Sequence, residues 1–332
     1  MTLESARSSG AVTLGYAAVC LALLFVIFGL LKVEPAEAAV TCTVTGPAMT
    51  FGTINPFSGF PYSTSGNASY SCTNNAAAAV TVQACVSVGT GTGGTTAANR
   101  TLASGADKLP IQITGGAASP APIGNGTSYP MQGPLAFTIG ANATATGTYA
   151  LAVTLSSPGV PPPPGNYISS FAGIDAQDFY TITGAPATCA ALIAGTKSTA
   201  QANFSVAATV PTQCSVAATG LAFPTASVLA TAVSATASIT ITCNAAVPVT
   251  VALDNGAIGT APTARRMQSG GNAITYGIYR DAAASQPWGN TNGSNTASSV
   301  GTSTLLAYGR VAAQASPPPG AYSDVVNVII TY

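Results

Sequence analysis

The sequence has 332 residues, of which 47% are hydrophobic and only 5% are charged, and it contains no histidine. From residue 40 onward it holds six aspartates, no glutamate and seven lysines and arginines, so it has neither the basic face expected of a nucleic-acid-binding protein nor the acid–base residues that most catalytic and metal sites need. We therefore expect a chain long enough for two domains that is not an enzyme, needs no cofactor or metal and binds no nucleic acid.

Residues 11–31 form an uncharged apolar run that is long enough to span a membrane as a helix. Arg7 precedes this run, and the small-residue sequence AEAA follows it at residues 36–39, which is typical of a signal-peptide cleavage site. We expect residues 1–39 to be a cleaved signal peptide and the mature chain to be exported. A retained N-terminal anchor is the alternative.

The stretch INPFSGFPYSTSG at residues 54–66 places Phe57, Phe60 and Tyr62 among prolines and glycines, where a helix cannot form and a regular strand is not expected. These three aromatic side chains either pack against the domain or are displayed to a partner. Counting strands along a sandwich places this stretch near the junction with the next domain, which favours packing there.

The sequence contains an internal repeat. The segment CTVTGPAMTFGTINP, which starts at Cys42, is similar to CSVAATGLAFPTASV, which starts at Cys214. A second cysteine follows each first one, 30 residues later at Cys72 and 29 residues later at Cys243. Further along each copy comes a proline-rich turn, PPPPGNY in the first and SPPPGAY in the second. We infer two copies of one domain.

Six cysteines remain after residue 40, and an even number in an exported protein favours disulfides, although the sequence alone leaves many pairings open. The repeat suggests the simplest pairing, in which Cys42–Cys72 and Cys214–Cys243 each join the first strand of a copy to its second. That leaves Cys85–Cys189, which belongs to the first copy alone. Free thiols are the alternative.

Short runs of alternating or continuous apolar residues fill both copies, among them SASITITC, VPVTVALD, AITYGIYRD and DVVNVIITY. Glycine, proline and asparagine clusters separate these runs, and no helical periodicity follows residue 40. The pattern predicts an all-β chain of two tandem β-sandwich domains, at residues 40–210 and 211–332.

The second copy combines a Cys-x-Val…Phe…Cys pattern with ALDNG at 252–256, RRMQSGGNAITYGIYRD at 265–281 and WGN at 288–290. In these features it resembles the spore coat protein U domain, which also forms the pilins of archaic chaperone–usher pili. The first copy keeps the cysteine pair, FGTINP and PPPPGNY but lacks the YGIYRD…WG segment, so its resemblance to the family is more distant.

The resemblance implies an immunoglobulin-like sandwich that lacks its last strand. A periplasmic pilus chaperone fills its groove first, and at the outer-membrane usher the next pilin subunit replaces the chaperone by donating a strand. The segment SDVVNVIITY fits this role, because it would end the domain on an unpaired apolar edge. Four of its residues share the face that would line the donor-strand groove: Val326, Val328, Ile330 and Tyr332. An ordinary edge strand is the alternative.

The first copy continues beyond its proline-rich turn and includes QANFSVAATV at 201–210, an alternating run. We expect this run to be the last strand of a self-complete first domain, while the second domain stays incomplete. Because Cys42 would already lie in the first strand of the mature chain, we expect no donor strand before it, and such a subunit would cap the fibre. The resemblance implies the same, a two-domain tip adhesin.

A tip adhesin would expose apolar loops on its first domain, and the resemblance implies adhesion to hydrophobic or abiotic surfaces, and biofilm formation, through such loops. Two segments are candidates: residues 116–134, which are rich in glycine and proline, and residues 172–196, which a Cys85–Cys189 bridge would anchor. The candidate contact residues are Ile123, Tyr129, Met131, Ile174, Phe179, Tyr180, Ile182, Leu192 and Ile193, with Phe57, Phe60 and Tyr62 as weaker candidates. The alternative is that these side chains cover the sandwich.

The leading hypothesis is therefore a secreted pilus tip adhesin that reaches the cell surface through the periplasm. A structural subunit of a fibre or coat without adhesive function is the alternative. A sugar-binding patch could be formed by Trp288, Tyr276, Tyr279, Asp281 and Arg280, but the family pattern places them in the framework, so we interpret them as core and surface packing residues.

Overall fold

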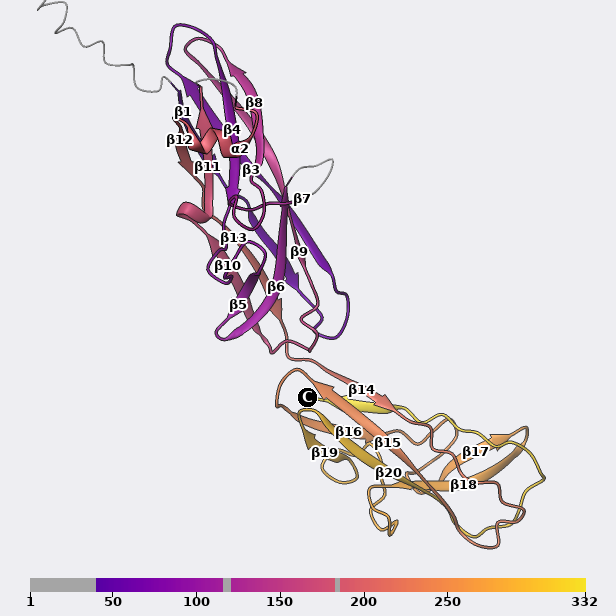
Figure 1. The fold of residues 1–332 in the computed structure, drawn as a ribbon. Helices are drawn as coiled ribbons and strands as arrows, with labels where there is room; N and C mark the ends of the chain where they lie inside the picture. The colour runs from indigo at the N-terminus through magenta and orange to yellow at the C-terminus, as the bar shows by residue number, and fades with distance from the viewer. Residues whose placement is uncertain (1–39, 116–120, 183–185) are drawn as a thin grey trace, which may run out of the picture.

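The computed structural model describes residues 40–115, 121–182 and 186–332, so the predicted signal peptide lies outside the described residues. Within this part of the chain the strands form two groups, β1–β13 and β14–β21, and no sheet contains strands of both. Figure 1 shows two elongated bodies that follow one another and are joined between β13 and β14. No helix in the described ranges is long and apolar enough to cross a membrane.

The first domain is a sandwich of two sheets. Its larger sheet has the strand order β1-β3-β9-β6-β5-β10-β13-β2, with the short β7 beside β6, and its smaller sheet has the order β12-β11-β4-β8. The apolar residues that alternate along these strands meet in one core, where Leu102, Ile113 and Val153 are completely buried. The elements are β1 (Val40–Thr45), β2 (Ala48–Thr53), β3 (Tyr62–Asn74), β4 (Val80–Val88), β5 (Arg100–Ser104), β6 (Asp107–Gly115), β7 (Ala121–Pro122), β8 (Gln132–Ile139), β9 (Ala143–Leu155), β10 (Gly165–Phe171), the 3-10 helix η1 (Gly173–Asp175), β11 (Ala176–Thr181), α2 (Cys189–Ala194), β12 (Ser198–Gln201) and β13 (Phe204–Val210).

The second domain is a smaller sandwich, with sheets of order β14-β15-β20-β18-β17 and β19-β16-β21. Trp288 is 1% exposed in its core and donates from Nε1 to the Val251 carbonyl oxygen at 2.9 Å, so it is a packing residue, as the sequence analysis indicated. The elements are β14 (Cys214–Ala218), β15 (Val233–Cys243), β16 (Pro248–Leu253), β17 (Arg265–Ser269), β18 (Asn272–Tyr279), β19 (Ala297–Val300), β20 (Ser303–Val311) and β21 (Val328–Thr331).

The two domains share the positions that the sequence repeat predicts. Cys42 lies opposite Cys72 across β1 and β3, and Cys214 lies opposite Cys243 across β14 and β15. The predicted disulfides are confirmed, namely Cys42–Cys72, Cys85–Cys189 and Cys214–Cys243. Each copy is therefore cross-linked at its first strand, and the first copy has one further link.

Each copy also buries one arginine at the first residue of a strand, Arg100 in β5 and Arg265 in β17. The Arg100 guanidinium donates from Nε to the Gly89 carbonyl oxygen at 2.7 Å, and Arg265 donates from Nε to that of Asp254 at 2.8 Å. Burial lowers the pKa of Arg100 to about 10 and lowers that of Arg265 as well. Since Arg265 is completely buried, the Arg265–Arg266 pair does not form an exposed basic face.

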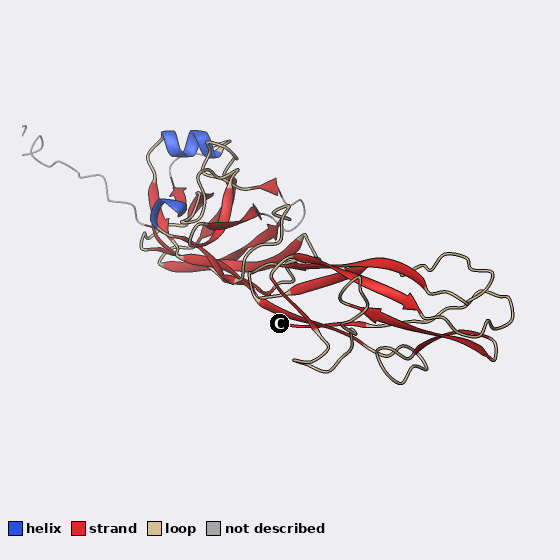
Figure 2. Cartoon of the chain, turned by 90° about the horizontal axis from the view of Figure 1, so that it is seen from below, coloured by secondary structure: helices blue, strands red, loops and turns tan. Residues whose placement is uncertain are grey.

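The segment 172–196 is more regular than the predicted loop, because it contains η1, β11 and α2. Figure 2 shows both short helices in the first domain, within a chain that is otherwise built of strands, so the predicted all-β fold class is confirmed. Helix α2 forms because its residues CAALIA include good helix formers and because the Thr188 hydroxyl caps it by accepting from Ala191 N at 3.1 Å. Strand β11 forms because it pairs with β4 on one side and with β12 on the other.

Candidate functional site

Strand β13 completes the first domain, as predicted for the run at 201–210, although the strand itself begins at Phe204. It lies between β10 and β2 in the larger sheet. It runs antiparallel to β10 over seven residue pairs, from Gly165 opposite Val210 to Phe171 opposite Phe204, and parallel to β2. The first domain thus supplies its own last strand.

The inward side chains of β13 are buried in the core of the first domain, where the strand lies between β10 and β2. Phe204, Val206, Ala208 and Val210 are each at most 8% exposed. The ring of Phe204 stacks on that of Phe171 with 4.6 Å between ring centroids. The cavity beside Phe204 is small, about 10 Å³. The first domain is therefore closed where β13 lies.

The corresponding position in the second domain is an open groove, which we call the acceptor groove. It is bounded by residues 218–229 on one side and by residues 316–328 on the other. Two adjacent hollows of about 430 and about 630 Å³ lie along it, and Leu221, Phe223 and Met267 line both. The groove is thus apolar and long, and it lies where the first domain holds a strand.

The shared proline-rich turn fixes the correspondence between β10 and the wall of the acceptor groove, because it aligns Tyr167 with Tyr322. Residues 320–327 therefore stand for β10, yet they form a single bridge, between Ser323 and Gln268. Val325, which lies in this segment, is 71% exposed. The counterpart of a regular strand is irregular here because no neighbouring strand pairs with it among the described residues.

Of the four residues predicted to line the donor-strand groove, two lie on this wall and two lie beyond it in the chain. Val326 and Val328 line the acceptor groove. Ile330 is half-buried in β21 and packs against the core, whereas Tyr332 is 51% exposed.

The polar groups beside the acceptor groove are paired with one another. The Tyr276 hydroxyl donates to Asp324 Oδ2 at 2.8 Å, and Asp324 Oδ1 accepts from Ala257 N at 2.9 Å. Burial, followed by the interaction with Asp324, raises the pKa of Tyr276 above its usual range. These bonds hold the groove wall against the loop after β16, so the polar groups satisfy one another and leave the apolar lining uncovered.

Three of the candidate contact residues are buried, and for them the prediction of exposed loops is wrong. Ile123 and Leu192 are 2% exposed, and Tyr180 is 6% exposed. Tyr180 faces the core because β11 is an interior strand, and its hydroxyl accepts from Cys42 N at 3.2 Å. Ile123 is held over the core because its own N–H donates to the Ile113 carbonyl oxygen.

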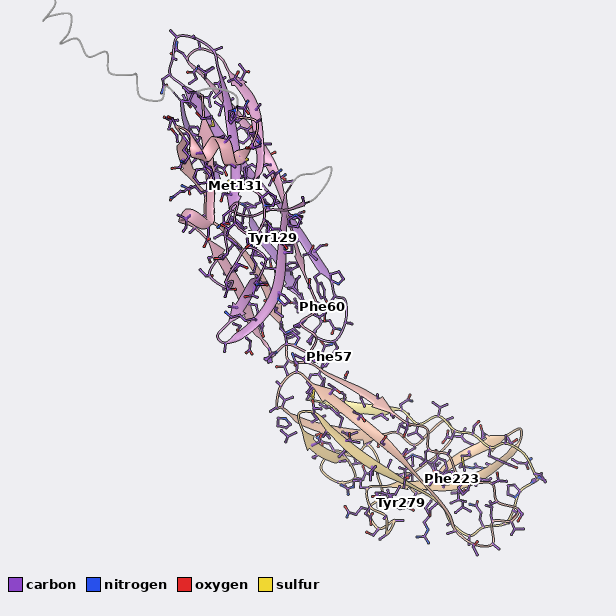
Figure 3. All side chains as sticks on the ribbon, in the orientation of Figure 1. Phe57, Phe60, Tyr129, Met131, Phe223 and Tyr279 are labelled. Atoms are coloured by element: carbon purple, nitrogen blue, oxygen red, sulfur yellow. A yellow bond between two sulfur atoms is a disulfide. The ribbon has the colours of Figure 1, made fainter. Side chains whose placement is uncertain are left out.

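The other loop candidates are half-buried or exposed. Ile174, in η1, is 79% exposed. The half-buried residues are Tyr129, Met131, Phe179, Ile182 and Ile193. Figure 3 places Tyr129 and Met131 along the side of the first domain, between its two ends. Tyr129 and Met131 therefore do not lie at a pole of the domain.

The aromatic stretch at 54–66 packs on the first domain at the end that faces the second domain (Figure 3). The rings of Phe60 and Tyr62 meet edge to face at 5.2 Å, and both pack against the core. The Tyr62 hydroxyl donates to the Ser58 carbonyl oxygen and accepts from Asn55 N, each at 2.9 Å. Packing, rather than display, thus describes Phe60 and Tyr62, and Phe57 is also half-buried.

Two loops at the opposite end of the first domain were missed by the sequence analysis (Figure 1). These distal loops comprise residues 75–79, between β3 and β4, and residues 140–142, between β8 and β9. Buried Asn74 ties them together, because its Nδ2 donates to the Ala78 carbonyl oxygen at 2.8 Å and to that of Gly140 at 2.9 Å. The alanine run at 76–79 was the available signal.

Comparisons with known proteins agree with the repeated architecture. The profile of the Spore Coat Protein U domain matches residues 27–172 and 200–329. The fold is similar to the CsuC–CsuE chaperone–tip adhesion subunit complex of archaic chaperone–usher Csu pili from Acinetobacter baumannii, at 18% identity over 88% of this chain and 100% of that chain, with a TM-score of 0.48. It is also similar to the CupB6 tip adhesin from Pseudomonas aeruginosa, at 13% identity over 89% and 95% of the two chains, with a TM-score of 0.34. The comparison with curated proteins found no match. The chain therefore belongs to the Spore Coat Protein U domain family and contains two regions that match this domain.

Proposed function

We propose that this protein is an exported subunit of a chaperone–usher pilus and that its second domain joins the fibre by accepting a strand from the next subunit. The proposal rests on the contrast between two copies of one domain: β13 fills a position in the first copy that no described strand fills in the second. An inserted strand would pair with residues 320–327 and cover the apolar lining, so it would gain backbone hydrogen bonds and bury apolar area.

The register of β13 suggests what the donated strand looks like. Phe204 lies opposite Phe171, and Ala208 lies opposite Tyr167. In the second domain, Val326 corresponds to Phe171 and Tyr322 corresponds to Tyr167. We therefore expect the donated strand to place a bulky apolar residue opposite Val326 and a small residue opposite Tyr322. The donor strand would thus alternate apolar and polar residues, as β13 does.

Before assembly the acceptor groove would expose its apolar lining to water, which favours aggregation. We propose that a periplasmic pilus chaperone covers the groove and that the donor strand of the next subunit replaces it at the outer-membrane usher. The protein would then reach the cell surface as part of the fibre.

The test adds a strand in cis. Residues 203–210 are appended after Tyr332 through a flexible linker of ~20 residues, similar in length to the segment between β11 and β13, and thermal unfolding is recorded. The second domain should melt at least about 5 °C higher, since each apolar side chain that becomes buried stabilises by about 1.5–3 kcal/mol. The matched control carries Asp in place of the appended Phe204 and Val206. Equal melting of all three proteins would show that the groove accepts no strand.

For adhesion we propose the distal loops of the first domain, at the tip of the fibre. They present Ala77, Ala78, Ala79 and Ala141 as exposed apolar groups and contain no charged residue. Because Asn74 already holds both loops in place, they would lose little conformational entropy on contact with a surface. Small apolar side chains in a fixed arrangement suit a hydrophobic, abiotic surface better than a specific receptor.

Substitution of the distal loops tests this proposal. Ala77→Asp and Ala79→Asp together should reduce attachment to polystyrene at least about tenfold while fibre assembly continues, because two desolvated charges oppose burial at an apolar surface. Ala106→Asp, an exposed change in the β5–β6 turn near the junction, is the matched control. Unchanged attachment of the double variant would show that the distal loops are not part of the adhesive surface.

A non-adhesive structural subunit is the second candidate, and the burial of Ile123, Tyr180 and Leu192 favours it. Fibres that contain this protein would then attach no better than fibres assembled without it. The same polystyrene assay, with the gene deleted and restored, decides between the two functions.

A further inference from the structure

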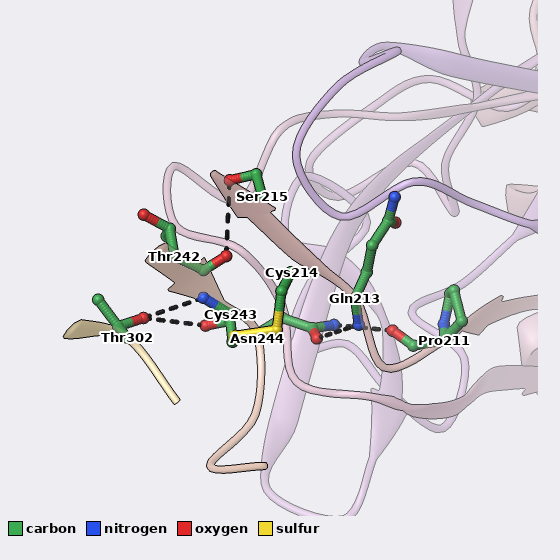
Figure 4. Close-up of a disulfide and its surroundings, with 8 residues drawn as sticks. All are labelled: Pro211, Gln213, Cys214, Ser215, Thr242, Cys243, Asn244 and Thr302. Carbon is green, nitrogen blue, oxygen red and sulfur yellow. Dashed lines mark hydrogen bonds between the residues drawn. A yellow bond between two sulfur atoms is a disulfide. The ribbon is translucent and has the colours of Figure 1, made fainter. Parts of the chain in front are cut away.

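One asparagine ties the two domains together. Asn244 is 8% exposed, and its Nδ2 donates to the Pro162 carbonyl oxygen of the first domain at 3.0 Å and to that of Pro211 in the linker at 2.9 Å. Its Oδ1 accepts from Gln213 N at 2.8 Å, beside the Cys214–Cys243 disulfide (Figure 4). A single side-chain amide thus fixes the proline-rich turn, the three-residue linker and the second domain in one arrangement.

Strand β13 has two roles at this joint. It is the last strand of the first domain, and it is also the segment that leads directly into the second domain. The first domain is therefore completed by the N-terminal extension of the domain that follows it. The proposed relation between the second domain and the next subunit is the same, so the internal joint is a structural template for that junction.

The proline-rich turn that accepts the bond from Asn244 in the first domain has a counterpart in the second domain. Tyr167 donates from its hydroxyl to the Pro163 carbonyl oxygen at 2.8 Å, and Tyr322 donates to that of Pro318 at the same distance. Each bond spans four residues, so the two proline-rich turns have the same tie. Pro317 therefore occupies the place of Pro162.

The two turns differ in what covers them. Pro162 is buried at the joint, whereas Pro317 is half-buried and the prolines after it are exposed. The Pro162 carbonyl oxygen accepts from Asn244, and no described residue donates to that of Pro317. The second domain thus presents an unoccupied acceptor where the first domain binds its successor.

We propose that the turn at residues 316–320 is a docking surface for the next subunit, and that this subunit is a domain of the same fold that presents a side-chain amide to the Pro317 carbonyl oxygen. The amide would come from an asparagine directly after the second cysteine of that domain, as Asn244 follows Cys243. This inference rests on the proposed strand acceptance and adds to it a contact that fixes the angle between consecutive subunits. Strand insertion holds the subunits together, and the amide contact makes their junction rigid.

A tandem protein tests the contact. The mature chain is followed by a second copy of residues 203–332 through a flexible linker of ~20 residues, so that the appended strand can enter the acceptor groove. Thermal unfolding reports strand insertion. Spin labels on unnatural amino acids at the Ser298 position of the last two domains report the junction, because the distribution of distances between them narrows when the domains dock.

The decisive variant replaces the asparagine at the Asn244 position of the appended copy by alanine. The distance distribution should widen at least about twofold, since linked domains move freely without a stabilised interface, while the thermal gain persists. Tyr322→Phe in the middle domain removes the hydrogen bond to the Pro318 carbonyl oxygen. The proline-rich turn is then held less firmly, so the distance distribution should widen in this variant too. Alanine at the exposed Asn272 position of the appended copy is the matched control and should change nothing.

The outcomes separate the two proposals. If the thermal gain is present but the unmodified tandem gives as wide a distribution as the alanine variant, the docking contact is wrong and strand acceptance stands. If the thermal gain is absent, strand acceptance is wrong and the docking proposal falls with it.

Discussion

Asp178 is a carboxyl group buried in the core of the first domain, and its removal should stabilise the protein above neutral pH. The residue is 8% exposed, and its one described side-chain partner is the Tyr149 hydroxyl, which donates to Oδ1 at 3.3 Å. The two cavities beside it measure about 10 and about 20 Å³, which is room for little more than one water molecule each. The charged form is therefore poorly solvated.

Burial raises the pKa of Asp178 to about 7 from an ordinary value of 3.8, although the hydrogen bond from Tyr149 opposes the change. Between these two values the folded domain holds a proton that the unfolded chain has lost, so the free energy of unfolding falls as pH rises through this window. The full shift corresponds to about 4 kcal/mol, which is reached at a pH above the folded-state value. Asp178→Asn keeps the size and an acceptor for Tyr149 but carries no charge.

The measurement is thermal unfolding of the wild type and Asp178→Asn at several pH values from about 4 to about 8. The wild-type first domain should lose stability across this range, and the variant should change little. At the alkaline end the variant should therefore melt higher, by about 5–15 °C for a domain of this size. Asp107→Asn, an exposed substitution in the same domain, is the control. Parallel pH profiles for wild type and Asp178→Asn would refute the argument from burial.

Two further predictions concern residues that the repeat brings into comparison. Phe204→Ala removes a buried ring from the self-supplied strand and should destabilise the first domain by about 3–5 kcal/mol in denaturant unfolding, whereas Phe223→Ala, beside the open groove, should cost less than half of that. Arg265→Lys cannot restore the bonds to several carbonyl oxygens and should cost at least about 3 kcal/mol, while the exposed Arg266→Lys should cost less than about 0.5 kcal/mol. If the two phenylalanine variants, or the two arginine variants, lost the same free energy of unfolding, the contrast drawn between a buried and a more open position would be wrong.

The strands and disulfides were predictable because two strong local signals agree. Alternating apolar residues predicted the run that became β13, and the repeated cysteine spacing predicted that Cys42 faces Cys72 and that Cys214 faces Cys243. Both signals depend on neighbours in sequence or on comparison of the two copies. They need no knowledge of how distant segments pack.

The exposure of the loops was not predictable in the same way, because an apolar residue in an irregular segment suits both a surface and a core. Tyr180 is buried because β11 inserts between β4 and β12, which is a long-range pairing that no local pattern encodes. Arg100 is different, since it is the first residue of its strand, as Arg265 is in the other copy. Careful alignment of the repeat would have identified it as a structural residue.

The origin of the completing strand should decide how each domain folds. In the first domain β13 is joined to the rest of the fold by the chain itself, and closing such a loop costs only a slowly growing entropy. A strand from another subunit must also lose translational and rotational freedom, which costs several kcal/mol more at ordinary concentrations. The stability of the first domain should then be independent of concentration. If the second domain accepts a strand as proposed, its stability should rise with the concentration of the strand donor, by about 1.4 kcal/mol for each tenfold increase above the dissociation constant.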